Sequence, residues 1–241
     1  MAGIGGEAKR IKLVVAYEGT EYCGWQVQPN GITIEGVLNN ALSKLLGDDI
    51  QVIGASRTDA GVHSLGNVAV FDTRAKIPPE KICYALNQRL PEDIVVQSSC
   101  QVPDGFHPRR CYSEKTYEYR TLNRKIPIPT LRRDTYFYYR DLDLMKMQQA
   151  AGYFVGEHDF KSFCTAKSNV EDTVRTIYSL DIKRDGDKIV LCISGSGFLY
   201  NMVRIIAGTL IRVGTGAFPP EAVSEILAAR DRRLAGPTAP A

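Results

Sequence analysis

Short strand-like apolar runs and amphipathic helical segments are interspersed along this 241-residue sequence, and they do not alternate strictly. Ile11–Tyr17, Asn67–Thr73 and Thr116–Leu122 are rich in β-branched or aromatic residues, which favour strands. Strict strand–helix alternation would predict a parallel sheet. The irregular order instead favours an α+β fold with a largely antiparallel sheet that carries helices on one face.

Two helices are predicted by apolar residues at helical spacing. Thr33 is a suitable N-cap for the first, which ends at Gly47, and the second is expected over Ser196–Val213. Three shorter helices are predicted at Pro78–Gln88, Leu142–Phe154 and Pro219–Ala229. A hairpin is predicted from Ile177–Lys183 and Lys188–Ser194, which flank Asp185-Gly186.

The chain is long enough for two domains, and the loop-like stretch at Pro103–Pro108 predicts the boundary. We expect a flexible tail at 1–9, an N-terminal α/β domain at 10–107 and a C-terminal α/β domain at 108–241.

Composition narrows the functional classes. The apolar runs are too short to cross a bilayer and residues 1–10 lack an apolar leader, so we expect a soluble cytoplasmic protein without membrane contact. The six cysteines form no C-x-x-C pair and the three histidines are dispersed, which disfavours a metal site. The sequence also lacks dinucleotide and P-loop fingerprints, so no cofactor is expected.

Positive charge is clustered although the net charge is only +3. The clusters are Arg109-Arg110, Arg132-Arg133 and Arg230/Arg232/Arg233. They are suited to phosphate contacts, and a solvated surface explains each equally well.

Gly54–His63 (GASRTDAGVH) is the least ordinary stretch. If it is extended, Arg57 and Asp59 point to the same side, and the arginine keeps the carboxylate ionised. Ala60-Gly61 permits a tight turn that lets a ligand approach the backbone. The structural alternative is an Asx-turn at Asp59 with Arg57 in a surface ion pair.

Two further segments carry candidate residues. Tyr117 and Tyr119 project to one face of a predicted strand, where they either pack or offer a stacking surface to an extruded base. Tyr200, Arg204 and Gly208 share a helix face apart from the apolar stripe. Arg204 either extends to solvent or delivers its guanidinium to a buried carboxylate.

Together these segments resemble the TruA family of tRNA pseudouridine synthases. The similarity runs in order through nearly the whole chain: Ala16–Gln28 (AYEGTEYCGWQVQ), Thr33–Leu46, Gly54–His63, Phe106–Pro108, Lys115–Tyr119 and Phe198–Gly208 (FLYNMVRIIAG). R-T-D-A-G-V-H is highly specific, and its agreement with the distant FLxxMVR segment makes chance similarity very improbable.

The resemblance implies a catalytic role for Asp59, with Arg57 in the same motif. It implies that Tyr117 stacks on the target base and that Arg204 pairs with the aspartate. The implied fold is two α/β domains that share a continuous sheet and flank a basic cleft, in a homodimer. Family members usually continue beyond a region like Ala235–Ala241 into a short G-L-x-L strand, which this sequence lacks.

The implied activity is the cofactor-free isomerisation of uridine to pseudouridine in the anticodon stem-loop of tRNA. We expect the base to be flipped into the site, where Asp59 either attacks the substrate or abstracts a ribose proton. An alternative is a non-catalytic tRNA-binding or folding protein on the same scaffold. A paired-acid hydrolase ranks lower, because the motif holds no second acidic residue near Asp59.

Overall fold

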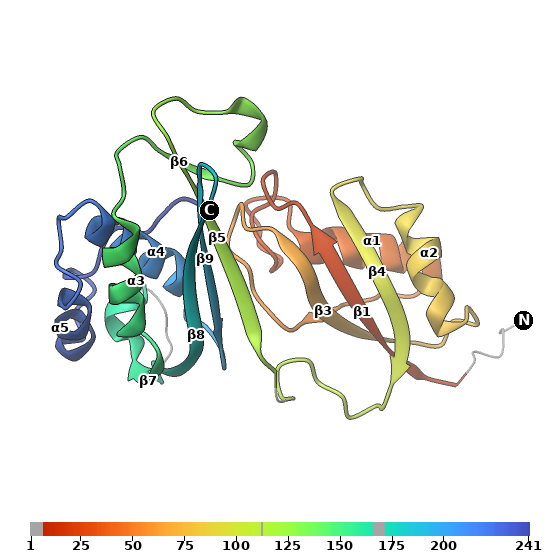
Figure 1. Cartoon of the computed structure of the whole chain (residues 1–241). Helices are drawn as coiled ribbons and strands as arrows, with labels where there is room; N and C mark the ends of the chain where they lie inside the picture. The colour runs from red at the N-terminus through yellow and green to blue at the C-terminus, as the bar shows by residue number, and fades with distance from the viewer. Residues whose placement is uncertain (1–6, 112, 166–171) are drawn as a thin grey trace, which may run out of the picture. The chain divides into compact units, whose positions relative to one another are not determined.

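The computed structural model describes residues 7–111, 113–165 and 172–241. The chain forms two compact units, Met1–Tyr112 and Ser113–Ala241 (Figure 1). The predicted boundary after residue 107 lies inside the first unit, and the assignment of two domains stays a prediction.

The first unit contains a four-stranded antiparallel sheet in the order β2-β3-β1-β4 (Figure 1). Its strands are β1 (Lys9–Tyr17), β2 (Ile53–Gly54), β3 (Ser64–Thr73) and β4 (Ile94–Val102). Every second residue of β1, from Ile11 to Tyr17, is buried, as expected for a strand with one face on a core. Helices α1 (Ile34–Leu46) and α2 (Ile82–Asn87) contribute to that same core.

Helix α1 begins and ends where the sequence predicts. The Thr33 hydroxyl accepts a hydrogen bond from the Gly36 backbone N–H at 3.2 Å, which satisfies one of the unpaired donors of the first turn. At the other end Gly47 adopts φ +76° and donates its N–H to the Ser43 carbonyl. Glycine suits this left-handed position because it has no Cβ.

The second unit contains a five-stranded sheet in the order β6-β5-β9-β8-β7. Its strands are β5 (Lys115–Asn123), β6 (Tyr136–Tyr138), β7 (Gly156–Asp159), β8 (Val174–Asp185) and β9 (Lys188–Gly195). Only β5 and β6 pair in parallel among these described strands. The predicted β8–β9 hairpin is confirmed.

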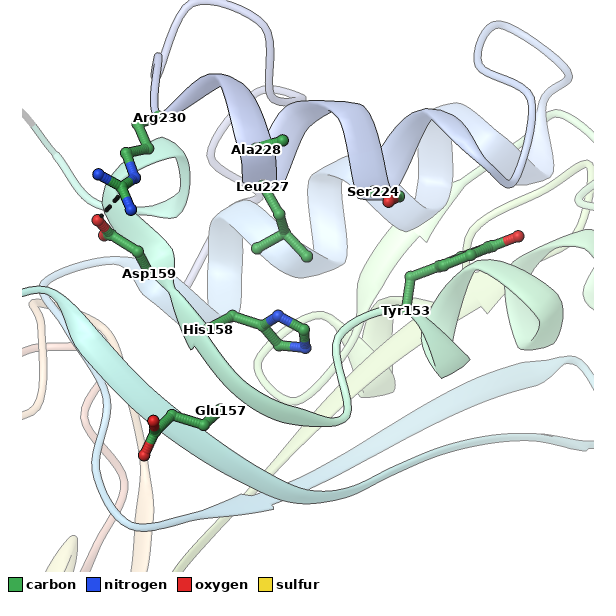
Figure 2. A pocket seen from close by; sticks show the side chains of 8 residues that line it. All are labelled: Tyr153, Glu157, His158, Asp159, Ser224, Leu227, Ala228 and Arg230. Carbon is green, nitrogen blue, oxygen red and sulfur yellow. Dashed lines mark ion pairs between the residues drawn. The ribbon is translucent and has the colours of Figure 1, made fainter.

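Helices α3 (Leu144–Gly152), α4 (Met202–Gly214) and α5 (Ala222–Ala229) complete the second unit. A cavity of about 600 Å³ lies beside edge strand β7 and helix α5 (Figure 2). His158 and Tyr153 extend into this region in Figure 2, and Arg230 pairs with Asp159 at its rim, with 3.1 Å between Nε and Oδ2.

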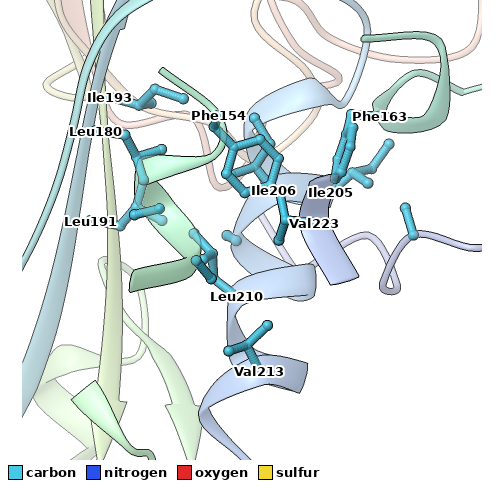
Figure 3. Packing of buried hydrophobic residues seen from close by; sticks show 14 of the residues in the cluster. Phe154, Phe163, Leu180, Leu191, Ile193, Ile205, Ile206, Leu210, Val213 and Val223 are labelled. Carbon is cyan, nitrogen blue, oxygen red and sulfur yellow. The ribbon is translucent and has the colours of Figure 1, made fainter. Parts of the chain in front are cut away.

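Helix α4 is the central element of the second core. Ten of its thirteen residues are buried, which is the pattern of a helix covered on most sides. Figure 3 shows Ile206 and Leu210 of α4 among side chains of the sheet and of neighbouring helices. Burying side chains of this size stabilises a fold by about 1.5–3 kcal/mol each, so α4 is firmly fixed.

The α+β class is confirmed, and several element boundaries differ from prediction. The helix predicted over Ser196–Val213 begins only at Met202, because Asn201 adopts φ +61° and interrupts the helical path. The helix predicted at Pro78–Gln88 is a 3-10 turn, Pro79–Lys81, followed by α2. The shared continuous sheet stays a prediction. In the described part of the chain, no helix is both long and apolar enough to span a membrane.

Candidate active site

The R-T-D-A-G-V-H segment lies in the connection between β2 and β3, at the end of the first sheet. A second loop, Glu18–Trp25, follows β1 and lies against the R-T-D-A-G-V-H segment. Backbone hydrogen bonds join the two loops: Trp25 N–H donates to the Thr58 carbonyl at 3.1 Å, and Gly61 N–H donates to the Tyr22 carbonyl at 3.3 Å. The motif is therefore held by main-chain contacts on both sides of Asp59.

Two glycines permit this close approach. A Cβ on Gly24 would lie 2.5 Å from the Thr58 carbonyl oxygen and 3.0 Å from the Asp59 carbonyl carbon. A Cβ on Gly19 would lie 2.2 Å from the Val62 carbonyl oxygen. Real Cβ atoms do not approach backbone so closely, so a larger residue at either position would push the loops apart.

Asp59 itself is half-buried and opens a tight turn. Its carbonyl accepts a hydrogen bond from the Val62 N–H at 3.2 Å, and Gly61 adopts φ +81° inside the turn. That conformation is the reason for glycine at this place. Arg57 is exposed, and its predicted ion pair with Asp59 stays a prediction.

The base of the motif loop is fixed by side chains. The Asn67 amide donates to the Ser56 carbonyl at 3.0 Å and accepts from the Ser56 N–H at 3.1 Å, which imitates a strand pair. Arg109 Nε donates to the Gly54 carbonyl at 2.7 Å. Burial and the nearby charge of Arg57 lower the pKa of Arg109, so positive charge is concentrated at this loop.

Trp25 supports the loop from the core. Its side chain is fully buried, and a Cβ on Gly54 would lie 2.4 Å from the indole ring. The indole Nε1–H is the one buried side-chain polar atom of the described residues that has no hydrogen-bond partner. Leaving such a group unpaired costs about 1–3 kcal/mol.

In the second unit, Tyr117 lies in β5 opposite Ile193 of β9. Its ring meets Phe198 edge to face, with 5.1 Å between centroids. Tyr119 packs against the same core, so the prediction that both tyrosines share a face is confirmed. The Tyr119 hydroxyl donates to the Pro240 carbonyl at 2.9 Å, and burial raises the pKa of Tyr119.

Arg204 is half-buried near the start of α4, and hydrogen bonds anchor its side chain. Its Nε donates to the Ala239 carbonyl at 2.8 Å, and its guanidinium also donates to Asn201 Oδ1 at 3.0 Å. Ala239 and Asn201 thus orient this arginine. Tyr200 lies before α4 begins, so the expected helix face of Tyr200, Arg204 and Gly208 is wrong in its first member.

Sequence reasoning missed several residues that fix these candidates. Tyr17, Gly24 and Asn67 hold the motif loop, and Ala239 holds Arg204 through its carbonyl. The one available signal was the inclusion of Tyr17 and Gly24 in the Ala16–Gln28 segment that resembles the family. Every residue has a backbone carbonyl, so the sequence does not indicate which carbonyls accept a side-chain hydrogen bond.

The cavity in Figure 2 contains none of the predicted site residues. The arginines of the third basic cluster, Arg230/Arg232/Arg233, form ion pairs and hydrogen bonds within the protein. Arg230 pairs with Asp159, Arg233 pairs with Asp231, and Arg232 donates to the Gly236 carbonyl. Among the described residues no group of three or more histidine, cysteine, aspartate or glutamate side chains is placed to hold a metal ion.

Comparisons with known proteins match this chain to one family. The model of a family described as tRNA pseudouridine synthase matches residues 13–109 and 150–241. A protein named tRNA pseudouridine synthase A from Brevibacillus brevis is 48% identical over 97% of this chain and 96% of its own length. Proteins of the same name from Thermoanaerobacter sp. and Ruminiclostridium cellulolyticum are each 47% identical, over 96% and 97% of this chain and 95% and 96% of their own lengths.

Among solved structures, one titled as a Cbf5-Nop10-Gar1 complex aligns with 14% identity and a TM-score of 0.33, covering 83% of this chain and 54% of that chain. The ranges that the family model matches include Asp59 and Arg204, and the relatives cover nearly the full chain. The chain belongs to the TruA family of tRNA pseudouridine synthases, and it is an isomerase.

Proposed function

We propose that this chain isomerises uridine to pseudouridine in the anticodon stem-loop of tRNA and that the Asp59 carboxylate does the chemistry. One observation carries the proposal: Asp59 is half-buried in a loop whose backbone is hydrogen-bonded on both sides. A carboxylate so held is preorganised, which is how a catalytic group gains its advantage over the same group in water.

The reaction fits a site of this composition. The bond between N1 of uracil and C1′ of ribose breaks, the base rotates, and C5 bonds to C1′ while C5 loses its proton and N1 gains one. Substrate and product have the same atoms, so no group donor is needed. Asp59 acts either as a nucleophile or as the base that removes a ribose proton.

Tyr117 and Arg204 have supporting roles in this proposal. The Tyr117 ring stacks on the flipped base, since its edge-to-face contact with Phe198 already sets its plane. Arg204 pairs with Asp59 and preserves its charge after water leaves the site. The anchoring of Arg204 by the Ala239 carbonyl supports this role, because a fixed guanidinium loses little entropy when it meets a carboxylate.

Arg57, in the motif loop, and Arg109, bonded at its base, provide positive charge there. We propose that they contact phosphates of the anticodon arm and set its register on the protein. A homodimer, which rests on the resemblance, and a cytoplasmic location, which rests on the sequence composition, complete the proposal.

The test is pseudouridine mapping on unmodified tRNA after incubation with the protein. Asp59→Asn should bind tRNA with unchanged affinity and form no pseudouridine. Asp104→Asn makes the same change in charge at an exposed site of the same unit and should react normally. Normal turnover by Asp59→Asn refutes the role of Asp59. If the unsubstituted protein binds tRNA and forms no pseudouridine, the non-catalytic alternative is correct.

A further inference from the structure

We propose that Tyr17 and Thr58 are positioning residues that set the orientation of the Asp59 carboxylate through a hydrogen bond between their hydroxyls. The inference deepens the proposed function and rests on it. Thr58 immediately precedes Asp59 in the chain, so whatever fixes Thr58 also fixes the backbone that carries the carboxylate.

Thr58 is held at its side-chain hydroxyl and at its backbone carbonyl. Its Oγ1 lies 2.8 Å from the Tyr17 hydroxyl oxygen, and its carbonyl accepts the Trp25 N–H at 3.1 Å. These two contacts act on different sides of the residue, so together they restrict rotation of the Thr58–Asp59 peptide. One contact alone would leave the residue free to pivot.

Neighbouring backbone also restricts movement of the Thr58–Asp59 segment. Gly24 lies so near that a Cβ there would be 2.5 Å from the Thr58 carbonyl oxygen, so the loop is already at contact distance on that side. On the C-terminal side, the Asp59 carbonyl is bonded to the Val62 N–H. The backbone is therefore fixed on both sides of the half-buried Asp59 side chain.

Packing does not explain the Tyr17 hydroxyl. Tyr17 is 5% exposed at the end of β1, and its ring lies 5.9 Å from the Trp25 ring, centroid to centroid. Phenylalanine would fill the same space. A buried phenol hydroxyl needs a hydrogen-bond partner, and the hydroxyl of Thr58, the residue before Asp59, provides one here. A misplacement of about 1 Å at a reacting group costs on the order of 100-fold in rate, so such a contact has consequences for catalysis.

The inference separates catalysis from tRNA binding. A positioning contact is used only after the substrate is bound, so its loss lowers kcat and leaves the affinity for tRNA unchanged. We expect Thr58→Val, which removes the hydroxyl and keeps the shape, to slow single-turnover pseudouridine formation about three- to tenfold, the rate equivalent of one hydrogen bond. Tyr17→Phe should give a similar loss.

Two controls make the test specific. Thr58→Ser keeps the hydroxyl and should restore the rate to within about twofold of the unsubstituted protein, well inside the loss expected for one hydrogen bond. The double variant Tyr17→Phe/Thr58→Val should be no slower than the slower single variant, because both changes remove the same contact. Tyr17→Phe also serves as the independent test if Thr58→Val does not fold.

Several results would overturn the inference: normal rates in both single variants, equal losses in Thr58→Ser and Thr58→Val, multiplying losses in the double variant, or a change confined to tRNA affinity. The proposed function fails separately, through an active Asp59→Asn. If Asp59→Asn is inactive while Thr58→Val and Tyr17→Phe are as fast as the unsubstituted protein, only the positioning role is wrong.

Discussion

Gly24→Ala tests whether the close contact between the two loops is required for stability. Gly24 adopts φ +87°, and Gly47 at the end of α1 adopts φ +76°. An alanine at either position is strained by about 1–2 kcal/mol because left-handed backbone is unfavourable for residues with a Cβ. At Gly47 nothing lies within 4 Å of the new Cβ, whereas at Gly24 it would lie 2.5 Å from the Thr58 carbonyl oxygen.

The difference between the two variants isolates the contact. Pushing backbone out of a packed site costs about 1–3 kcal/mol in addition to the strain. We therefore expect Gly47→Ala to lower the free energy of unfolding by about 1–2 kcal/mol, and Gly24→Ala by about 2–5 kcal/mol. Urea unfolding followed by the fluorescence of Trp25 measures both, since it is the only tryptophan and belongs to the first unit.

Activity gives a second readout of the same change. The atoms that a Cβ on Gly24 would displace belong to the peptides on either side of Asp59, Thr58–Asp59 and Asp59–Ala60. Gly24→Ala should therefore also slow pseudouridine formation below the temperature at which it unfolds. Gly47→Ala should not. Equal destabilisation of the two variants, together with normal activity of Gly24→Ala, would refute the view that this contact shapes the site.

Three further predictions concern the second unit and the substrate. Gly208→Ala would place a Cβ 1.9 Å from the Pro237 carbonyl oxygen and should lower the thermal midpoint, whereas Gly152→Ala faces open space and should not. Burial raises the pKa of Asp159, but hydrogen bonds from Thr173 and the Lys161 backbone N–H, together with the charges of Arg230 and Lys161, outweigh it and leave the pKa lowered. Its contribution to stability is therefore present above the unfolded pKa and lost as pH falls through the folded pKa, and Thr173→Val should raise that pKa in a carboxyl NMR titration. Finally, tRNA affinity should fall steeply between about 50 and 200 mM salt in filter binding, since phosphate contacts release counterions.

The sequence predicted elements whose signals are local. The cap at Thr33, the stop at Gly47 and the turn at Asp185-Gly186 all depend on residues within a few positions, and the structure confirms them. Strand β6 was missed, because a segment of three aromatic residues forms a strand only by pairing with β5, which is distant in the sequence. Its hydrogen-bond partners are set by tertiary structure, which periodicity does not encode.

The helix predicted from Ser196 shows the limit of apolar spacing. Leu199 and Met202 have the interval of a helix face, yet Asn201 between them is left-handed. Asparagine tolerates that conformation through its short polar side chain, and here the side chain bonds to Thr165 and to Arg204. The bend thus follows from contacts that place Arg204, and a pattern of hydrophobicity carries no information about them.

Backbone carbonyl groups hold both the loop of Asp59 and the side chain of Arg204, which affects how these sites respond to mutation. Asp59 lies in a loop held by the carbonyls of Tyr22 and Thr58, and Arg204 is held by the carbonyl of Ala239. A carbonyl acceptor depends on the path of the chain and not on the side chain that it carries. Substitutions that keep the path therefore leave these anchors intact, even at buried positions such as Ala239. These backbone anchors should instead be sensitive to substitution at Gly19 and Gly24, where a Cβ would change the path of the chain itself.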